Sequence, residues 1–204
     1  MHKLITALDL SPQQKKLLET YLELLSKWNK TYNLTAIKDY DEMVVKHILD
    51  SLSIKEYVAG NTIIDVGTGA GLPGLVLAIV FPDKHFTLLD SNGKKIRFLI
   101  QAIHELGLKN CATVQARAED YKPEKTFDCV TSRAFADLKL MLDLTRHLAH
   151  ENTVWLAMKG DVSDEELSHI AHAKKINLSV PGLDEKRALV LINSCTKDLK
   201  FKVI

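Results

Sequence analysis

The spacing of hydrophobic residues changes near residue 60. Before that point, leucines and other apolar residues recur every three or four positions, which predicts helices. One helix is expected to begin at Ser11 and Pro12, a capping residue followed by a first-turn proline. The stretch WNKTYNLT, residues 28–35, is expected to break this helix, and a second helix is expected over residues 41–57.

After residue 60, short apolar runs alternate with helical segments. Strands are expected in five runs, which are TIIDV, HFTLLD, CATVQA, FDCVTS and TVWLAM. Apolar strands separated by helices indicate an α/β fold with a parallel sheet covered on both faces. A helix is expected over residues 165–175, followed by INLSV and RALVLIN as an antiparallel pair at the sheet edge. The chain is therefore divided into a helical extension, residues 1–60, and a sheet domain, residues 61–204.

Composition limits the classes of function. The chain has 204 residues, of which 46% are hydrophobic and 26% charged, as in ordinary globular proteins. The net charge of +1 provides no global field for nucleic acid, so such a partner would need local basic groups. No apolar run approaches a membrane span, and the first residues, MHKLITALDL, lack the apolar core of a signal peptide. We therefore expect no membrane partner.

The cysteines indicate the cellular compartment. Cys111, Cys129 and Cys195 are widely spaced, and each lies in or beside an apolar run. They are expected to be free buried thiols, with neither a disulfide framework nor a C-x-x-C metal site. This use of cysteine favours the cytoplasm.

The glycine-rich stretch DVGTGAGLPG, residues 65–74, contains two overlapping cofactor signatures. From Gly69 it matches G-x-G-x-x-G, the dinucleotide pattern. From Asp65 it matches an acidic residue followed by G-x-G-x-G, the pattern of S-adenosylmethionine (SAM) enzymes. Asp65 would repel a pyrophosphate but can order the loop or favour an ammonium or sulfonium group, and the register from Gly67 fits a strand-to-helix turn better. The loop therefore favours SAM over NAD.

Acidic residues follow the next two strands, where ligands of such sheets bind. Asp90 ends the second strand about twenty residues beyond the glycines, the place of an acid that accepts ribose hydroxyls. Glu119, with the backbone of Ala118, follows the third strand, where the edge of an adenine would lie. The alternatives are a helix cap for Asp90 and a solvated loop acid for Glu119.

Arg133 directly follows the fourth strand, where the transferred group is expected. No acid or histidine directly follows that strand to act as an obvious base, so an arginine suits an acceptor that needs no deprotonation, such as guanine N7. Arg117 and Lys159 add positive charge at the same rim and can hold RNA phosphates. The alternatives are a structural salt bridge for Arg133 and solvated charges for the other two.

The histidines do not predict a metal site. His147 with His150, and His169 with His172, are spaced three apart in expected helices, but neither pair has a nearby cysteine or a clear third ligand. His47 lies in KHILDS with Asp50 and Ser51, and a helix packed over the sheet near the cofactor could place all three at the mouth of the pocket. The favoured expectation is that His47 is a hydrogen-bonded packing residue.

Several motifs occur together in one order. They are WNKTYNLT, KHILDSL, IIDVGTGAGLPG, FTLLDS, RAED, SRAFADL and MKG. In this order and spacing they closely resemble the RsmG (GidB) family, the bacterial guanine-N7 methyltransferases of 16S ribosomal RNA. The resemblance spans residues 28–160 and implies a class I SAM-dependent methyltransferase fold, Rossmann-like, with a mostly parallel seven-stranded sheet. It also implies one guanine in the decoding-region loop as substrate, in free 16S rRNA or in the small ribosomal subunit.

The resemblance also assigns roles to individual residues. Family SAM contacts fall on Gly67, Leu72, Ala118, Glu119 and Arg133, and Asp90 keeps its ribose role. With the rest of the loop, the expected cofactor residues are Asp65, Gly67, Gly69, Gly71, Leu72, Asp90, Ala118, Glu119 and Arg133. The expected RNA contacts are Arg117, Arg133 and Lys159, with Arg133 as the catalytic positioning residue and no metal.

The resemblance has one departure and two further implications. Ala70 stands where many members have proline, which should loosen the loop only slightly. The family precedent is a monomer. Guanine N7 is unprotonated at neutral pH, so methyl transfer to it requires no general base.

Three other functions remain as alternatives. A nicotinamide-dependent oxidoreductase would need a hydride-transfer partner such as a Tyr/Lys pair, for which the sequence offers no clear candidate. A small-molecule methyltransferase would use the same fold and ignore RNA. A non-catalytic module would bind RNA without a cofactor.

Overall fold

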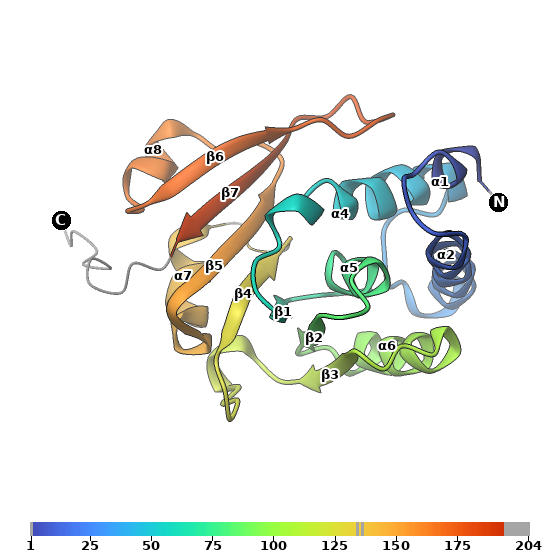
Figure 1. Cartoon of the computed structure of the whole chain (residues 1–204), viewed down its shortest axis with the longest axis horizontal. Helices are drawn as coiled ribbons and strands as arrows, with labels where there is room; N and C mark the ends of the chain where they lie inside the picture. The colour runs from blue at the N-terminus through green and yellow to red at the C-terminus, as the bar shows by residue number, and fades with distance from the viewer. Residues whose placement is uncertain (1, 134, 136, 194–204) are drawn as a thin grey trace.

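The protein is built around one sheet, with helices on both faces (Figure 1). The computed structural model describes residues 2–133, 135 and 137–193. Within these residues the sheet has seven strands in the order β3-β2-β1-β4-β5-β7-β6. The strands are β1 Thr62–Val66, β2 His85–Asp90, β3 Cys111–Gln115, β4 Phe127–Ser132, β5 Ala149–Lys159, β6 Ala173–Leu178 and β7 Arg187–Asn193.

The directions of the strands confirm the predicted α/β class. Strands β3, β2, β1, β4 and β5 pair in parallel, while β7 is antiparallel to both β5 and β6. The chain order reverses beside β1, because β2 lies on one side of it and β4 on the other. This switch point brings the carboxyl ends of β1, β2 and β4 together, which is where ligands of such sheets bind.

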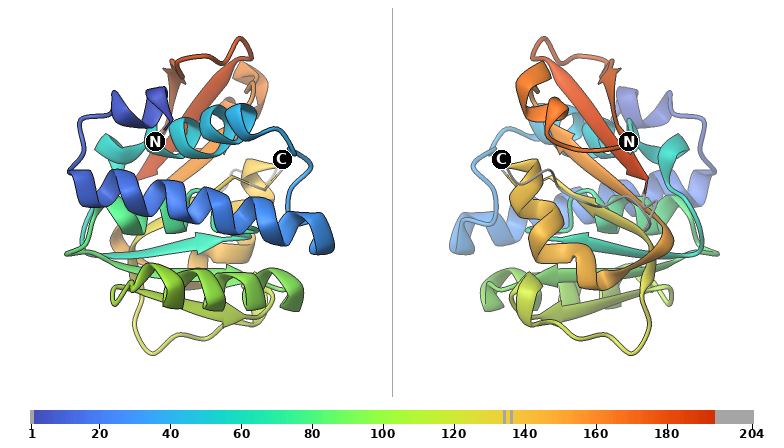
Figure 2. Two further views of the ribbon diagram at one scale, coloured as in Figure 1. Left: turned by 90° about the vertical axis from the view of Figure 1, so that its right-hand side faces the viewer. Right: turned by 90° about the vertical axis from the view of Figure 1, so that its left-hand side faces the viewer.

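α-Helices lie on both faces of the sheet (Figure 2), and each face has its own hydrophobic cluster. They are α1 Lys3–Thr6, α2 Pro12–Tyr32, α3 Tyr40–Met43, α4 Asp50–Leu52, α5 Gly74–Val80, α6 Gly93–Leu106, α7 Leu138–Thr145 and α8 Asp164–Ser168. Successive strand residues alternate between the faces: Ile64 and Val130 pack with α7, and Ile63 and Cys129 pack with α5. The helices α2, α5 and α6 share a further cluster on the α5 side.

The first long helix ends where the sequence predicts. The break is expected within residues 28–35, and α2 ends at Tyr32, followed by Asn33 in the left-handed conformation at φ 50°. Trp28 continues the apolar face of the helix, because its ring packs against that of Phe98 at 5.8 Å between centroids. The predicted break is confirmed, because the helix ends within this stretch.

The second predicted helix, residues 41–57, is present but irregular. It consists of α3, a π-helix at Val44–Leu49 (η1), the short α4 and a 3-10 turn at Lys55–Tyr57 (η2). π-Helical segments are rare and occur frequently at functional sites. This segment lies over the carboxyl end of β4, as described below.

The predicted helix over residues 165–175 is present only as far as Ser168, and the prediction is wrong beyond it. The helix α8 ends at Ser168, and β6 begins at Ala173, where it pairs with Ile192 of β7. Hydrogen bonding to β7 therefore overrides the local preference of the sequence. The other short helical turns are η3 Ala118–Asp120, after β3, and η4 Arg146–Leu148, after α7.

Two remaining expectations concern thiols and membranes. Cys111 and Cys129 are free, and burial raises the pKa of both thiols, whereas Cys195 lies outside the described residues. Among the described helices, none combines the length and apolar character needed to cross a bilayer.

Candidate active site

Asp65, at the end of β1, lies beneath the glycine loop that follows it. Its carboxylate is fully buried, and Oδ2 accepts hydrogen bonds from the Thr68 hydroxyl at 2.6 Å and the Gly74 backbone N–H at 2.8 Å. Burial raises the pKa of Asp65 to about 6. Oδ1 is also buried and has no hydrogen-bond partner among the described residues. The geometry supports ordering of the loop, the first of the two roles expected for this acid.

The predicted glycines have different surroundings. Gly67, Gly69 and Gly71 have φ angles of 70°, 62° and 99°, a region in which L-residues are strained. A Cβ placed on Gly69 would meet no atom closer than 3.8 Å, so the backbone there is open to a ligand. A Cβ placed on Gly71 would approach Leu75 and Leu99 to within 2.8 and 2.9 Å. Gly69 therefore has open space beside it, whereas Gly71 is packed against the core.

The far side of the loop is held by the helical extension, a contact that the sequence did not predict. The Tyr21 hydroxyl, on α2, donates to the Ala70 carbonyl at 2.9 Å, and both residues are buried. Burial raises the pKa of Tyr21 far above its usual value. Leu72 is also buried and belongs to the same core cluster. The extension is thus part of the support of the loop.

Asp90, at the end of β2, ties the glycine loop to the next helix. Its Oδ2 accepts the Gly69 N–H at 2.9 Å, and its Oδ1 accepts the Asn92 N–H at 2.8 Å. The Lys95 ammonium lies 3.6 Å from Oδ2. A carboxylate has about four acceptor positions, so these contacts leave room for further donors such as ribose hydroxyls.

The predicted residues after β3 lie on the surface. Ala118 and Glu119 belong to η3, where Ala118 is half-buried and Glu119 is exposed. Arg117 precedes them and is also exposed.

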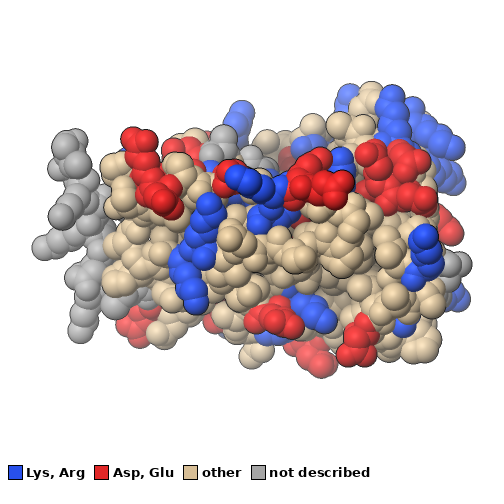
Figure 3. Space-filling model, turned by 90° about the horizontal axis from the view of Figure 1, so that it is seen from above, with Lys and Arg blue, Asp and Glu red and all other residues tan. Residues whose placement is uncertain are grey.

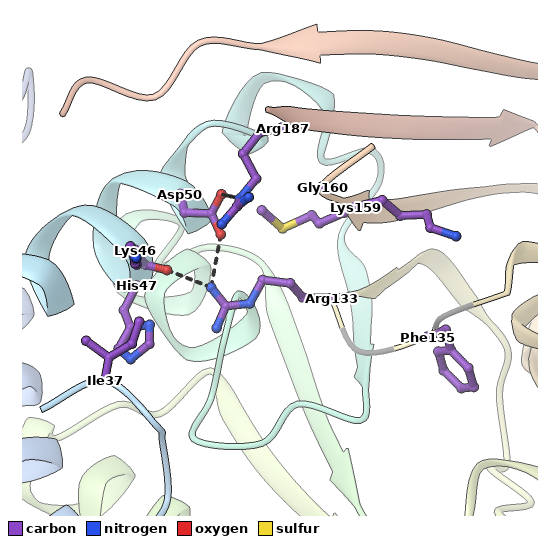
Figure 4. A pocket seen from close by; sticks show the side chains of 10 residues that line it. Ile37, Lys46, His47, Asp50, Arg133, Phe135, Lys159, Gly160 and Arg187 are labelled. Carbon is purple, nitrogen blue, oxygen red and sulfur yellow. Dashed lines mark hydrogen bonds and ion pairs between the residues drawn. The ribbon is translucent and has the colours of Figure 1, made fainter. Parts of the chain in front are cut away.

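Arg133, directly after β4, points toward the second helical segment of the extension (Figure 4). One guanidinium nitrogen, NH1, donates to the Lys46 carbonyl at 2.9 Å and to Asp50 Oδ2 at 3.0 Å. Asp50 Oδ1 accepts a second hydrogen bond, from Nε of Arg187 at 3.2 Å. Asp50 is only 2% exposed, so one buried carboxylate compensates two arginines. The structural salt bridge considered for Arg133 is therefore present.

His47 lies beside this cluster as a packing residue. It is 3% exposed, and its Nε2 forms a hydrogen bond with the Thr35 hydroxyl at 3.0 Å. Burial, assisted by the positive charge of Arg133, lowers the pKa of His47 to about 4. The imidazole is therefore neutral near pH 7.

A cavity of about 430 Å³ opens beside the arginines (Figure 4). The residues that line it come from the extension and from the ends of β4, β5 and β7: Ile37, Lys46, His47, Asp50, Arg133, Phe135, Met158, Lys159, Gly160 and Arg187. The structure thus brings Arg133 and Lys159 to one cavity, whereas Arg117 is not among its lining residues. The Lys159 side chain extends away from Asp50 and is paired with Glu166.

Sequence reasoning missed Arg187 and did not assign Asp50 to the site. Arg187 lies in the run RALVLIN, which was assigned only to an edge strand, and Asp50 was considered only as a residue that a packed helix could place at the pocket mouth with His47. The available signal was the acid within the apolar helical run KHILDSL. An acid that is buried by such a run needs a cationic partner.

The histidine pairs do not form metal sites in the described part of the chain, where no group of three or more potential metal ligands occurs. Nε2 of His147 contacts the Tyr121 carbonyl, and that of His150 contacts Asp128. His169 and His172 lie after α8 rather than within it.

Solved structures with a similar fold define the class of protein. A SAM-dependent methyltransferase from Aquifex aeolicus has a TM-score of 0.56 at 18% identity, covering 74% of this chain and 93% of that one. M. jannaschii TYW2 in complex with AdoMet has a TM-score of 0.53 at 13% identity, covering 70% and 74%. Together with the sheet order and the glycine loop, these similarities define the fold of a SAM-dependent methyltransferase.

Sequence comparison then gives the family. The profile of GidB, described as rRNA small subunit methyltransferase G, matches residues 14–190. Ribosomal RNA small subunit methyltransferase G of Psychromonas ingrahamii is 50% identical over 198 residues, covering 94% of this chain and 96% of that protein. The protein of the same name from Legionella pneumophila strain Philadelphia 1 is 52% identical over 183 residues, covering 89% and 88%. The chain belongs to this methyltransferase family, as its motifs predicted.

Proposed function

We propose that this protein transfers a methyl group from SAM to N7 of one guanine in the decoding-region loop of 16S ribosomal RNA. The observation that carries the proposal is membership of the small-subunit rRNA methyltransferase family over most of the chain. Bound SAM would supply an electrophilic methyl group on its sulfonium. We further propose that the protein acts as a monomer in the cytoplasm, on free rRNA or on a small-subunit particle.

The residues at the glycine loop fit this cofactor. The open backbone at Gly69 accommodates close approach of a ligand, and Asp90 beside it retains acceptor capacity for ribose hydroxyls. Gly67, Leu72 and the η3 residues Ala118 and Glu119 are proposed to complete the cofactor site. Asp65 is proposed to act from beneath, by holding the loop in shape through Thr68 and Gly74.

The groups around Arg133 suit an acceptor atom that carries no proton. Asp50 is committed to two arginines, and neutral His47 is hydrogen-bonded to Thr35. Neither is a free base among the described residues of the cavity. Guanine N7 has a lone pair at neutral pH, so the task of the protein is to orient the base, and orientation can contribute about 7–11 kcal/mol.

We propose that Arg133 positions the guanine, because a guanidinium pairs naturally with guanine O6 or with a phosphate. Its NH1 is held by Lys46 and Asp50, which fixes the direction of the side chain before substrate binds. The target base must leave its stack to reach such a cavity, as in other enzymes that modify a base.

The decisive experiment incubates the protein with methyl-labelled SAM and 16S rRNA, both free and in 30S particles from a strain that lacks the enzyme. We expect label at one guanine N7. Label on small metabolites alone would favour a small-molecule methyltransferase, and RNA binding without transfer would favour a non-catalytic module. Tight NADH binding without SAM binding would indicate the oxidoreductase.

Two variants test the residue assignments. Arg133→Ala should cut turnover by roughly a hundredfold, the size of effect that misplacement of a substrate produces, with the fold intact. Asp90→Ala should weaken SAM binding in a calorimetric titration, and Asp83→Ala, an exposed acid before β2, is the matched control. Unchanged turnover or unchanged SAM affinity would remove the respective residue from the site.

A further inference from the structure

A second cavity lies in the helical extension, outside the site described above. It has a volume of about 330 Å³ and is lined by Ser26, Asn29, Lys30, Asn33, Lys38 and Met43. These residues come from the last turns of α2, the loop that follows it and α3. Five of these six residues carry a polar or basic side chain, and none is acidic. Such a lining suits an anionic ligand.

The two lysines of this cavity carry positive charge that the described part of the protein does not neutralise. Lys30 and Lys38 make no ion pair or hydrogen bond with any residue that the structure describes. Asp39 follows Lys38, but its carboxylate caps α3 by accepting the Glu42 N–H at 2.9 Å. Figure 3 shows basic side chains gathered at the edge of the molecule on the side of the N-terminal helices, with acidic side chains beside them.

The cations that line the active-site cavity are, in contrast, neutralised by ion pairs. Each pairs with an acid of the protein: Lys46 with Glu42 and Glu185, Arg133 with Asp50, Lys159 with Glu166, and Arg187 with Asp50 and Glu185. An ion-paired cation gives up part of its attraction for a phosphate, because its partner competes. Among the described cations that line the two cavities, those without an acidic partner are therefore Lys30 and Lys38 of the second cavity.

One short loop joins the two cavities. Ile37 of this loop lines the active-site cavity, while Asn33 and Lys38 line the second one. The loop is fixed at its centre: the Thr35 N–H donates to Asn29 Oδ1 at 2.9 Å, and the Thr35 hydroxyl contacts His47 Nε2 at 3.0 Å. These hydrogen bonds fix the loop that separates the two cavities. An RNA strand that leaves one cavity can therefore cross this loop and enter the other.

We propose that the cavity with Lys30 and Lys38 is a phosphate subsite for the RNA strand that carries the target guanine. This inference rests on the proposed function. The two ammonium groups hold the backbone of a nucleotide that flanks the guanine, while the guanine itself occupies the cavity beside Arg133. Contacts to phosphate give register and affinity without reading sequence, which leaves selection of the base to the active site.

Binding of a fluorescent single-stranded RNA containing the target loop tests the subsite, with anisotropy measured over a range of salt concentrations. The double variant Lys30→Gln/Lys38→Gln should lower the affinity by about tenfold and reduce the slope of log K against log salt by roughly 0.7 per lost phosphate contact. Its SAM affinity, and its kcat at saturating RNA, should equal those of the wild type. The matched control is Lys109→Gln/Lys174→Gln, two exposed lysines at the outer strands β3 and β6.

The outcomes separate this inference from the proposed function. Equal affinity and equal salt slope in the two double variants would overturn the subsite, whatever the methylation result. Absence of guanine-N7 methylation by the wild type would overturn the proposed function. It would leave the test of the subsite intact, because RNA binding is measured without methyl transfer. A fall in kcat with unchanged RNA affinity would also count against a phosphate subsite.

Discussion

Arg133 and Asp50 meet at 3.0 Å between NH1 and Oδ2, although 83 positions separate them in the chain. Asp50 belongs to the helical extension, and Arg133 follows a central strand of the sheet. The extension thus holds the residue that we expect to position the substrate. Arg187 reaches the same carboxylate from the last strand.

Asp50→Asn should damage both stability and catalysis. The amide keeps the size of the side chain but leaves two arginines without their shared charge, at an expected cost of about 1–3 kcal/mol in the free energy of unfolding. Methyl transfer should fall more than SAM affinity, because Arg133 loses its fixed direction. Urea unfolding and a calorimetric SAM titration check this. Asp143→Asn, which breaks surface pairs with Lys139 and Arg146, should cost only about 0.5 kcal/mol.

Tyr21→Phe should loosen the glycine loop from the side of the extension. The substitution leaves the buried Ala70 carbonyl without its donor, which should cost about 1–3 kcal/mol of stability and weaken SAM binding. Tyr32→Phe, at a side chain that is 40% exposed, is the matched control. Identical SAM affinities in the two variants would show that the hydroxyl does not support the loop.

Gly69→Ala and Gly71→Ala should fail in different ways. Both residues have positive φ, but only the new methyl group at position 71 meets core atoms, on Leu75 and Leu99. Gly71→Ala should therefore lose about 1–3 kcal/mol more stability than Gly69→Ala. Gly69→Ala should fold and lose SAM affinity, because its methyl group occupies the open side of the loop. Normal SAM binding by that variant would contradict the fit of the loop to the cofactor.

His47 should make stability depend on pH. Its pKa is about 4 in the folded protein against 6.5 ordinarily, so the unfolded chain binds more protons between these values. Stability should fall as pH drops from 6.5 to 4, by up to about 3 kcal/mol from this group. His47→Gln should remove that loss in urea unfolding at several pH values, whereas His147→Gln, at an exposed position, should not.

Asp65 should act in the opposite direction over nearly the same range. Its pKa is raised to about 6, so the folded protein binds more protons than the unfolded chain between about pH 4 and 6. This group alone makes stability fall as pH rises through that window. Asp65→Asn should therefore show a steeper rise of stability from pH 4 to 6 than the wild type, because the His47 contribution remains. A slope equal to that of the wild type would mean that Asp65 titrates normally.

Local sequence patterns were sufficient for much of the fold. The apolar runs of β1, β2, β4, β5 and β7 supply buried strands, and the glycines after β1 have positive φ, so the strands and the loop after β1 could be placed. An error occurred where long-range contacts outweigh local preference. Pairing with β7 draws residues 173–175, which the sequence assigned to a helix, into the strand β6.

The sequence by itself determined the α/β class, the family and the rim of strand ends that holds Asp90 and Arg133, because hydrophobic period, glycine spacing and motif order are local properties of the chain. The tertiary structure decided which charges remain available. It paired Arg133 and Arg187 with Asp50 and Lys159 with Glu166, and it left Lys30 and Lys38 without a partner among the described residues. Ion pairing depends on which distant segments the fold brings within a few ångströms, and no local pattern encodes that distance.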